Sequence, residues 1–332
     1  MYRARIIGTG FYVPPKVVTN HDLEQMFDTN DEWIRQRTGI RERRYIDEGM
    51  TGAEMSASAA RAACENAGIE VGEIDFLFHA TLSPDHVMPG TGVITGGLLG
   101  LNGVPAMDVR NQCSGFLYSL TTAKALIEVG MYKTILVTGC EIHSTGLEFS
   151  DRGRDVTVLF GDGAGSVIVT REDRGEGWGI LKSIIHADGK YYKELWVECD
   201  GSRHHPRITP EMIEDGRIYP RMKGRRVFVH AVKRQPEVMR RVLEEAGYGV
   251  RDVDAYIFHQ ANLRIIEAVG AELGIPDPRI FNNIDKYGNT TAASIPIALH
   301  EAREAGLIKE GSLVMLTAFG AGFTWGAILI KW

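Results

Sequence analysis

Cys113 stands in the segment NQCSGF (111–116), where a strand-like run ends and a helix-like run begins. A thiol at a helix start is close to free backbone N–H groups and to the positive end of the helix dipole, which both favour the nucleophilic thiolate. The small residue Gly115 lets a substrate carbonyl come close. A buried structural cysteine is the alternative, since free cysteine is among the most buried residue types. This segment alone leaves the two interpretations evenly balanced.

Three later segments carry groups that could assist such a nucleophile. His259 follows the apolar run AYIF, Asn289 lies in YGNTTAASIP (287–296), and Ala321 lies in the glycine-rich TAFGAGFTWG (317–326). An Asn side chain donates hydrogen bonds but cannot take up a proton, and N–H groups in a glycine-rich turn can face an oxyanion. Taken singly, each has a plain structural alternative: a packed histidine, a turn or N-cap asparagine, and a tight turn.

The elements that must position these groups alternate between strand-like and helix-like, which indicates an α/β fold. The patterns predict strands at 6–10, 75–80, 106–110, 133–139 and 165–170, and helices at 51–67 and 115–129. Thr51 and Glu54 have the spacing of a capping box at the start of the first helix.

The second half of the chain resembles the first. AGIEVGEIDFLFHAT (67–81) is similar to AGYGVRDVDAYIFHQA (246–261), and GMYKTILVTG (130–139) is similar to GSLVMLTAFG (311–320). Such a repeat predicts a duplicated α/β fold with a site between the two copies. Two ordinary helix–turn–strand units are the alternative. Between the halves, the polar and irregular segment 188–222 is a candidate lid.

Composition excludes several classes of protein. The chain has 332 residues, 44% of them hydrophobic and 24% charged, and a formal net charge of −6, so we expect a sizeable core and no general attraction to nucleic acid or membrane. No stretch approaches the ~20 apolar residues of a membrane span, and the N-terminus does not resemble a signal peptide. The four cysteines match neither a disulfide framework nor a CxxC metal site, so we expect reduced thiols in a cytoplasmic protein. They are Cys64, Cys113, Cys140 and Cys199.

Two short motifs are set aside. GDGAG (161–165) lacks the ending of a phosphate-binding loop, so we expect a structural turn near the site. His204 and His205 have no spaced partners, and we therefore predict no metal site.

Together, the order and spacing of Cys113, His259, Asn289 and the glycine-rich turn resemble the thiolase-fold condensing enzymes. The closest pattern is that of β-ketoacyl-acyl carrier protein synthase III, the initiating ketosynthase of bacterial fatty-acid synthesis. The resemblance runs nearly end to end, through GTGFYVPPKVVTN, NDEWIRQRTGIRER, DRG followed by LFGDGAG, HQANLRI, GNTTAASIP and FGAGFTWG. It implies a thiolase-like fold of two similar α/β halves in αβαβα layers: 1–172 with the cysteine, and 173–332 with the His, the Asn and the 188–222 loop.

The resemblance implies a decarboxylative Claisen condensation without a cofactor. Cys113 would take the acyl group from acyl-CoA, and the backbone N–H groups of Cys113 and Ala321 would hold the tetrahedral intermediate. Neutral His259 and Asn289 would donate hydrogen bonds to the thioester oxygen of malonyl-acyl carrier protein as carbon dioxide leaves. The products would be β-ketoacyl-acyl carrier protein, CoA and carbon dioxide.

The resemblance also implies contacts with substrates and partners. Trp33, Arg37 and Arg152 would bind CoA at the pocket mouth, although a core tryptophan is the alternative for Trp33. Arg264 would meet the acidic carrier protein, or be a solvated surface residue. Met88 would reach across a homodimer to the partner's acyl pocket. Four further residues match the pantetheine channel: Gly224, Phe228, Ala261 and Asn262.

Some features depart from the family and leave alternatives open. The 190–222 segment is longer than in compact members, and Arg225, Arg226 and Val229 differ from common residues, which puts the acyl starter and carrier contacts in doubt. A thiolase normally has a second cysteine near the last glycine-rich turn, and none follows Cys199 here. The alternatives are a related acyltransferase, a starter enzyme of a secondary-metabolite or polyketide pathway, and a non-catalytic acyl-CoA-binding subunit. Loss of Cys113 would be expected in such a subunit.

Overall fold

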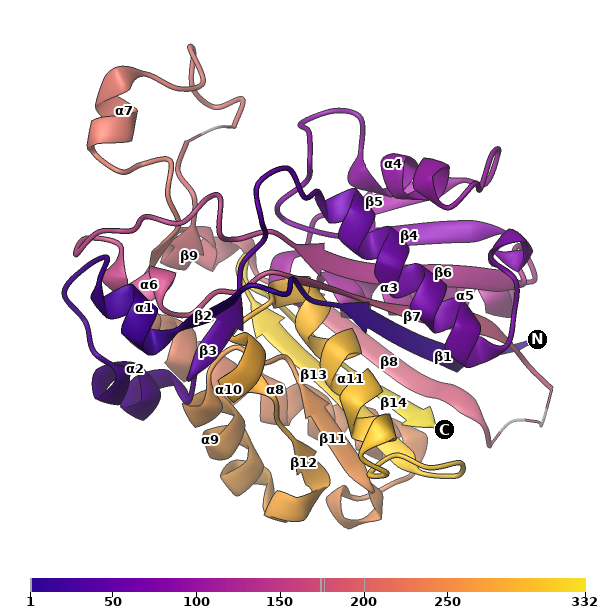
Figure 1. The fold of residues 1–332 in the computed structure, drawn as a ribbon. Helices are drawn as coiled ribbons and strands as arrows, with labels where there is room; N and C mark the ends of the chain where they lie inside the picture. The colour runs from indigo at the N-terminus through magenta and orange to yellow at the C-terminus, as the bar shows by residue number, and fades with distance from the viewer. Residues whose placement is uncertain (1, 174, 176, 200) are drawn as a thin grey trace.

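Two five-stranded sheets form the frame of the computed structural model, which describes residues 2–173, 175, 177–199 and 201–332 (Figure 1). Counted from the edge where its strands are parallel, each sheet has two parallel strand pairs followed by two antiparallel pairs. The first sheet has the order β1 (Arg3–Tyr12), β7 (Gly163–Glu172), β6 (Thr134–Glu141), β4 (Phe76–Ala80) and β5 (Ala106–Val109). The second has the order β12 (Ile280–Phe281), β11 (Ala255–Phe258), β13 (Leu313–Gly320), β14 (Thr324–Lys331) and β8 (Gly179–Ala187).

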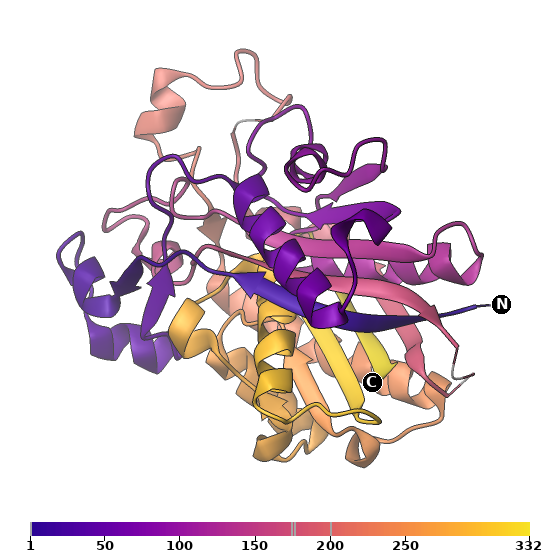
Figure 2. The same ribbon diagram turned by 45° about the vertical axis from the view of Figure 1, so that its right-hand side comes forward.

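Helices complete five layers (Figures 1 and 2). α3 (Gly52–Ala67) covers the outer face of the first sheet, α5 (Gly115–Glu128) and α11 (Ser294–Glu304) lie between the sheets, and α8 (Gly224–Ala246) and α9 (Leu263–Leu273) cover the second sheet. The αβαβα arrangement of a thiolase-like fold is confirmed.

Burial on both faces explains the continuous apolar runs of the central strands. In β6, Ile135 and Val137 point into the core around α5, and Leu136 points to the cluster under α3. Side chains alternate between the faces of a strand, so a strand covered on both sides needs apolar residues throughout. The strands and helices predicted in the first half are confirmed, and so is the capping box of Thr51 and Glu54.

The repeated sequence segments fold alike. Gly68 caps the C-terminus of α3 and Gly247 caps that of α8, both in the left-handed conformation, and a 3₁₀ turn and a buried strand follow in each copy. Asp75 and Asp254 then accept a backbone N–H at the start of the neighbouring parallel strand, β6 or β13. The sequence repeat therefore corresponds to one structural unit used twice.

The segment 188–222 has two parts. It starts with a 3₁₀ turn (Gly189–Glu194) against the body, and the part that carries α7 (Pro210–Glu214) projects away from the sheets (Figures 1 and 2). β9 (Leu195–Trp196) and β10 (Arg221–Met222) pair at its base.

The other elements are β2 (Val17–Thr19), α1 (Asn20–Glu24), α2 (Asp31–Thr38), β3 (Glu42–Arg44), α4 (Thr91–Leu98), α6 (Arg154–Thr157) and α10 (Ile284–Tyr287). Among the described residues, no helix is long and apolar enough to cross a membrane.

Candidate active site

Cys113 lies in a 3₁₀ turn (Gln112–Ser114) directly before α5, with its side chain buried. Gly320, at the end of β13, lies against it. A Cβ atom at position 320 would be 2.4 Å from the Cys113 Cβ and 2.7 Å from its Sγ, so only glycine leaves room for the thiol. The backbone N–H groups of Ala321 and Cys113 itself act on the sulfur. Tertiary packing thus brings the glycine-rich turn onto the nucleophile.

Burial, however, opposes the thiolate. It raises the pKa of Cys113 to about 12, and the charge of Glu141 acts in the same direction, while the N–H groups of Ala321 and Cys113 act against them. The N–H groups near the helix start do favour the thiolate, as predicted, but in the free protein burial outweighs them. The free-energy cost of removing a charged sulfur from water exceeds the stabilisation that the nearby N–H groups provide. The free thiol therefore keeps its proton at neutral pH.

Hydrogen bonds between distant segments fix the glycine-rich turn. The Ser114 hydroxyl donates to the carbonyl oxygen of Thr324 at 3.0 Å, and the Thr324 hydroxyl lies 3.2 Å from the carbonyl oxygen of Ala321. Asp188 and Phe323 exchange two backbone hydrogen bonds of 2.7 and 2.9 Å. The start of the 188–222 segment is therefore attached to the turn that touches Cys113.

His259 follows β11 and continues its pairing with β13 through a 2.8 Å hydrogen bond from its N–H to the carbonyl oxygen of Thr317. Its Nδ1 atom lies 2.7 Å from the Ser294 hydroxyl oxygen, and its Nε2 atom has no hydrogen-bond partner among the described residues. Burial lowers the pKa of His259 to about 3. The imidazole is therefore neutral at physiological pH, with one nitrogen held and the other free.

Asn289 lies before a 3₁₀ turn (Thr291–Ala293) that leads into α11. Its backbone N–H donates to the carbonyl oxygen of Leu159 at 2.8 Å, and its Oδ1 atom accepts the backbone N–H of Thr291 at 2.9 Å. This bond assigns the amide orientation, so the NH₂ group remains available as a donor. The Ser294 hydroxyl lies 2.9 Å from the Thr291 carbonyl oxygen, which links the supports of His259 and Asn289.

A cavity of about 360 Å³ joins these groups. Its buried end includes Cys113, His259 and Asn289, and exposed side chains at its other end include Arg37 and Arg225. The pocket therefore leads from the surface to the thiol. The remaining predicted residues on its wall are Gly224, Phe228, Ala261, Asn262 and Arg264.

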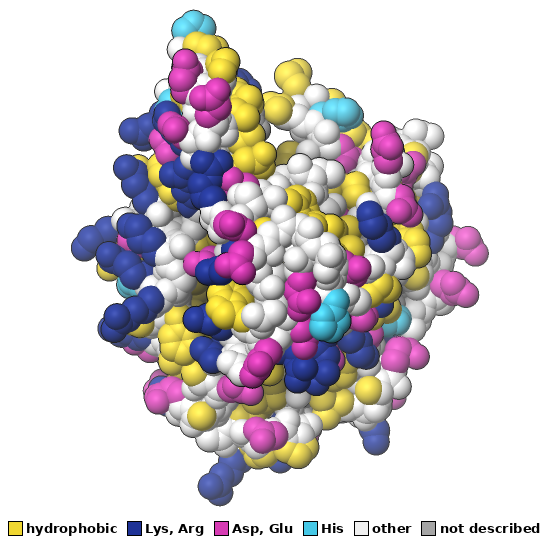
Figure 3. All heavy atoms as spheres, turned by 60° about the vertical axis from the view of Figure 1, so that its left-hand side comes forward, with side chains coloured by type: hydrophobic (Ala, Val, Ile, Leu, Met, Phe, Trp, Pro, Cys, Tyr) yellow, Lys and Arg dark blue, Asp and Glu magenta, His cyan; other side chains and the backbone are white. Residues whose placement is uncertain are grey.

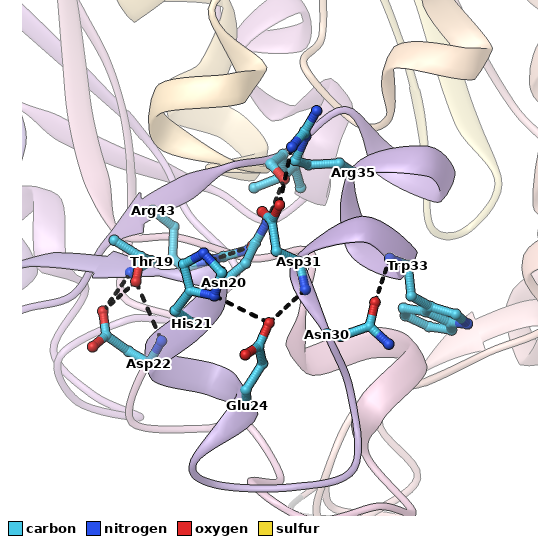
Figure 4. Close-up of polar contacts among 11 residues, drawn as sticks. Thr19, Asn20, His21, Asp22, Glu24, Asn30, Asp31, Trp33, Arg35 and Arg43 are labelled. Atoms are coloured by element: carbon cyan, nitrogen blue, oxygen red, sulfur yellow. Dashed lines mark hydrogen bonds and ion pairs between the residues drawn. The ribbon is translucent and has the colours of Figure 1, made fainter.

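Trp33 lies outside this lining, on α2. Figure 4 shows how α2 begins: the Asn30 side chain accepts the Trp33 backbone N–H at 2.8 Å, and Asp31 accepts a 2.9 Å hydrogen bond from Asn20. The half-buried Trp33 ring packs on a core cluster, and the guanidinium carbons of Arg37 and Arg154 lie 4.4 and 4.8 Å from its centroid. The Trp33 ring thus packs partly against the core and partly against the two guanidinium groups.

Two other predicted residues also lie outside the lining. Arg152 is paired with Glu148 at 2.6 Å and donates to the carbonyl oxygen of Glu214 at 2.8 Å, at the C-terminal end of α7. Met88 is 82% exposed, in the loop between β4 and α4. Neither residue touches the pocket of its own chain.

Several supporting residues were not singled out from the sequence. Thr291 and Ser294 are hydroxyl residues inside the GNTTAASIP motif, which was the available signal. GDGAG has a structural role, as predicted, but it is not a turn, because its last three residues begin β7. A Cβ atom on Gly161 would lie 2.4 Å from the carbonyl oxygen of Tyr287, and Asp162 accepts the backbone N–H of His143. No group of three or more His, Cys, Asp or Glu that could hold a metal occurs in the part of the chain that the structure describes.

Buried neutral histidines predict acid sensitivity. Burial lowers the pKa of His79 and lowers those of His143 and His259 from 6.5 to about 3. Between pH 6.5 and pH 3 these histidines bind protons in the unfolded chain but not in the folded chain. The free energy of unfolding therefore falls as the pH falls below 6.5. His143 and His259 should each cost about 2 kcal/mol of unfolding free energy by pH 5. His143→Phe should therefore lose about 2 kcal/mol less than the unsubstituted protein between pH 7 and 5, measured by urea unfolding. Equal losses would contradict the prediction.

The comparisons with known proteins agree with this geometry. Residues 107–189 match the family model for 3-oxoacyl-[acyl-carrier-protein] synthase III, and residues 243–332 match the model for its C-terminal part. A β-ketoacyl-[acyl-carrier-protein] synthase III from Caldanaerobacter subterraneus is 43% identical over 329 residues, 99% of this chain and 98% of that protein. The crystal structure of the Aquifex aeolicus 3-oxoacyl-[acyl-carrier-protein] synthase III has a TM-score of 0.90 and 43% identity, covering 99% and 100% of the two chains. The priming β-ketosynthase of the R1128 polyketide pathway has a TM-score of 0.89 and 31% identity, covering 99% and 96%.

Proposed function

The chain belongs to the 3-oxoacyl-[acyl-carrier-protein] synthase III family, and we propose from this premise that Cys113, His259 and Asn289 carry its chemistry. It is a condensing acyltransferase that joins an acyl-CoA starter to malonyl-acyl carrier protein and so initiates fatty-acid synthesis. One observation carries the assignment of residues: a single pocket holds the thiol, a histidine and an asparagine, and the His259 Nε2 atom and the Asn289 NH₂ group have no hydrogen-bond partner among the described residues.

In the first step, Cys113 Sγ attacks the thioester carbon of acyl-CoA. The N–H groups of Cys113 and Ala321, which already act on the sulfur, stabilise the oxyanion of the tetrahedral intermediate. The carbon–sulfur bond to CoA then breaks, and the thiol proton leaves with the CoA sulfur. The product is an acyl-cysteine in a buried pocket, where water has little access to hydrolyse it.

In the second step, malonyl-acyl carrier protein loses carbon dioxide, and the electron pair forms an enolate on the thioester. We assign the proton of neutral His259 to Nε2, the tautomer in which Nδ1 accepts the Ser294 hydroxyl proton and Nε2 can donate into the pocket. His259 and the Asn289 amide donate to the enolate oxygen. The carbanion attacks the acyl-cysteine and the carbon–sulfur bond breaks, and the released thiolate, whose pKa burial keeps high, takes a proton from water.

Basic side chains suit the phosphates of CoA and an acidic carrier protein. Figure 3 shows Lys and Arg side chains gathered below the projecting segment that carries α7. Arg37, Arg225 and Arg264 line the mouth of the pocket, and Arg152 contacts the C-terminal end of α7. We assign Trp33 to adenine stacking, where the base would compete with a guanidinium group for the ring.

An apolar surface at the edge of the first sheet supports a homodimer. Met107 on the edge strand β5, Val87 and Met88 in the loop before α4, and Val93 and Leu98 on α4 are exposed. Exposed apolar patches mark interfaces, and an edge strand can pair with a second copy. In this dimer, Met88 would enter the partner's acyl pocket. The proposed location is the cytoplasm, where the free thiols of the chain would remain reduced.

Met88→Phe is expected to shift the preference toward shorter acyl-CoA chains. Methionine is flexible and adapts to irregular ligands, whereas a phenylalanine ring would fill the end of the pocket. We expect the kcat/KM ratio of long to short acyl-CoA to fall about tenfold, roughly the effect of one or two methylenes in an apolar pocket. Val93→Phe, a change on the same surface outside the loop, is the control. An unchanged ratio in Met88→Phe would remove Met88 from the acyl pocket.

The proposed function is tested in two assays on one protein. Mass spectrometry after mixing with a panel of acyl-CoA molecules detects the acyl adduct on Cys113, and release of carbon dioxide from malonyl-acyl carrier protein reports decarboxylation. We expect both. No adduct on Cys113 would favour a non-catalytic binding subunit, and an adduct without carbon dioxide release would favour a plain acyltransferase.

A further inference from the structure

His143 is a buried histidine in the loop after β6 that the two chemical steps do not use. Its backbone N–H donates to Asp162 at 2.6 Å, and its ring stacks on Phe160 with the centroids 4.4 Å apart. Its Nε2 atom lies 2.7 Å from the Thr291 hydroxyl oxygen. Both the backbone and the ring of His143 are therefore fixed, and the ring is directed at Thr291.

Thr291 occupies a conformation that needs support. Its φ angle is +47°, in the left-handed region, which is strained for a β-branched residue. This backbone conformation lets the Thr291 N–H group reach the Asn289 Oδ1 atom at 2.9 Å, while the Thr291 carbonyl oxygen lies 2.9 Å from the Ser294 hydroxyl oxygen. A change of the Thr291 backbone would therefore turn the Asn289 amide, whose NH₂ group is the free donor of the pocket.

We propose that His143 is a positioning residue for decarboxylation, which holds Thr291 in the left-handed conformation and thereby aims the Asn289 amide at the enolate oxygen. The proposal rests on the donor role of Asn289 in the proposed function. His143 itself lies behind Thr291 and acts through it. Because burial lowers the pKa of His143 to about 3, this hydrogen bond stays between neutral groups across the physiological range.

The position of His143 predicts that only one half-reaction depends on it. Acyl transfer uses Cys113 and the N–H group of Ala321, which are held by Ser114, Thr324 and Gly320 rather than by Thr291. Decarboxylation uses Asn289. A residue that merely stabilises the fold would lower both half-reactions together, so the ratio between them separates positioning from stability.

The test compares His143→Phe, which keeps the ring stacking, with Thr291→Val, which keeps the branched shape and removes the hydroxyl. Each should lower carbon dioxide release from malonyl-acyl carrier protein about tenfold and leave the rate of Cys113 acylation within about twofold. The double variant should be no slower than either single variant, since both remove one interaction. His143→Gln, which keeps a hydrogen-bonding side chain, should restore part of the decarboxylation rate.

Thr138→Val is the matched control, because it also removes a buried threonine hydroxyl, which lies 2.8 Å from the Ser166 hydroxyl in the first sheet. It should leave both half-reactions within about twofold, and thermal unfolding checks that every variant is folded. Parallel losses in both assays, unchanged decarboxylation, or losses that multiply in the double variant would each overturn the role of His143. If the unsubstituted protein is acylated but releases no carbon dioxide, the proposed function fails instead, whatever the variants do.

Discussion

Cys113→Ala is expected to abolish the acyl adduct and to lower the condensation rate by three orders of magnitude or more, as loss of a catalytic nucleophile does. The thiol is the atom to which the acyl group is attached, and the alanine methyl group cannot replace it. His259 and Asn289 keep their hydrogen bonds in this variant, so decarboxylation of malonyl-acyl carrier protein should persist within about tenfold. Intact-protein mass spectrometry and carbon dioxide release measure the two effects separately.

Cys64→Ala serves as the control for this experiment. Cys64 is another buried thiol, but it lies on α3 in the cluster on the outer face of the first sheet. Its removal should leave the adduct and the condensation rate unchanged apart from a loss of stability. An adduct that survives in Cys113→Ala, or one that disappears in Cys64→Ala, would show that the acyl group is carried elsewhere.

Asn289→Ala should slow decarboxylation and spare acylation, the reverse of the effect of Cys113→Ala. Carbon dioxide release is expected to fall about 10²- to 10³-fold, the usual loss when one donor to a developing oxyanion is removed. Acylation of Cys113 should change by less than about threefold, because that step uses the N–H groups of Cys113 and Ala321. Single-turnover measurements with acyl-CoA alone, and then with malonyl-acyl carrier protein, distinguish the two steps.

Asn66→Ala is the corresponding control, because the Asn66 side chain accepts a backbone N–H from Thr9 outside the pocket. We expect neither half-reaction to respond to it. If Asn289→Ala slows acylation as much as decarboxylation, Asn289 is a structural support of the whole pocket, and its assignment as a donor in the second step is wrong.

Local signals in the sequence were sufficient for much of the fold. Apolar runs located β4 and β6, and the spacing of Thr51 and Glu54 located the start of α3. Hydrophobic periodicity and capping depend on neighbouring residues, so they can be read without a tertiary structure. The repeated segments likewise predicted two similar units, because each folds through the same Ala-Gly helix end and the same Asp before a strand.

The sequence by itself also determined which groups are available for chemistry: Cys113, His259, Asn289 and a glycine-rich turn, in an order that resembles one family. Only the tertiary structure decided how these groups behave. The N–H groups near the helix start favour a thiolate, as predicted, yet burial outweighs them and raises the pKa of Cys113 to about 12. Gly320 packs on the thiol, and His143 reaches Thr291 from 148 positions away in the chain. Desolvation and hydrogen-bond geometry depend on every atom around a group, and folding draws those atoms from segments that no local pattern connects.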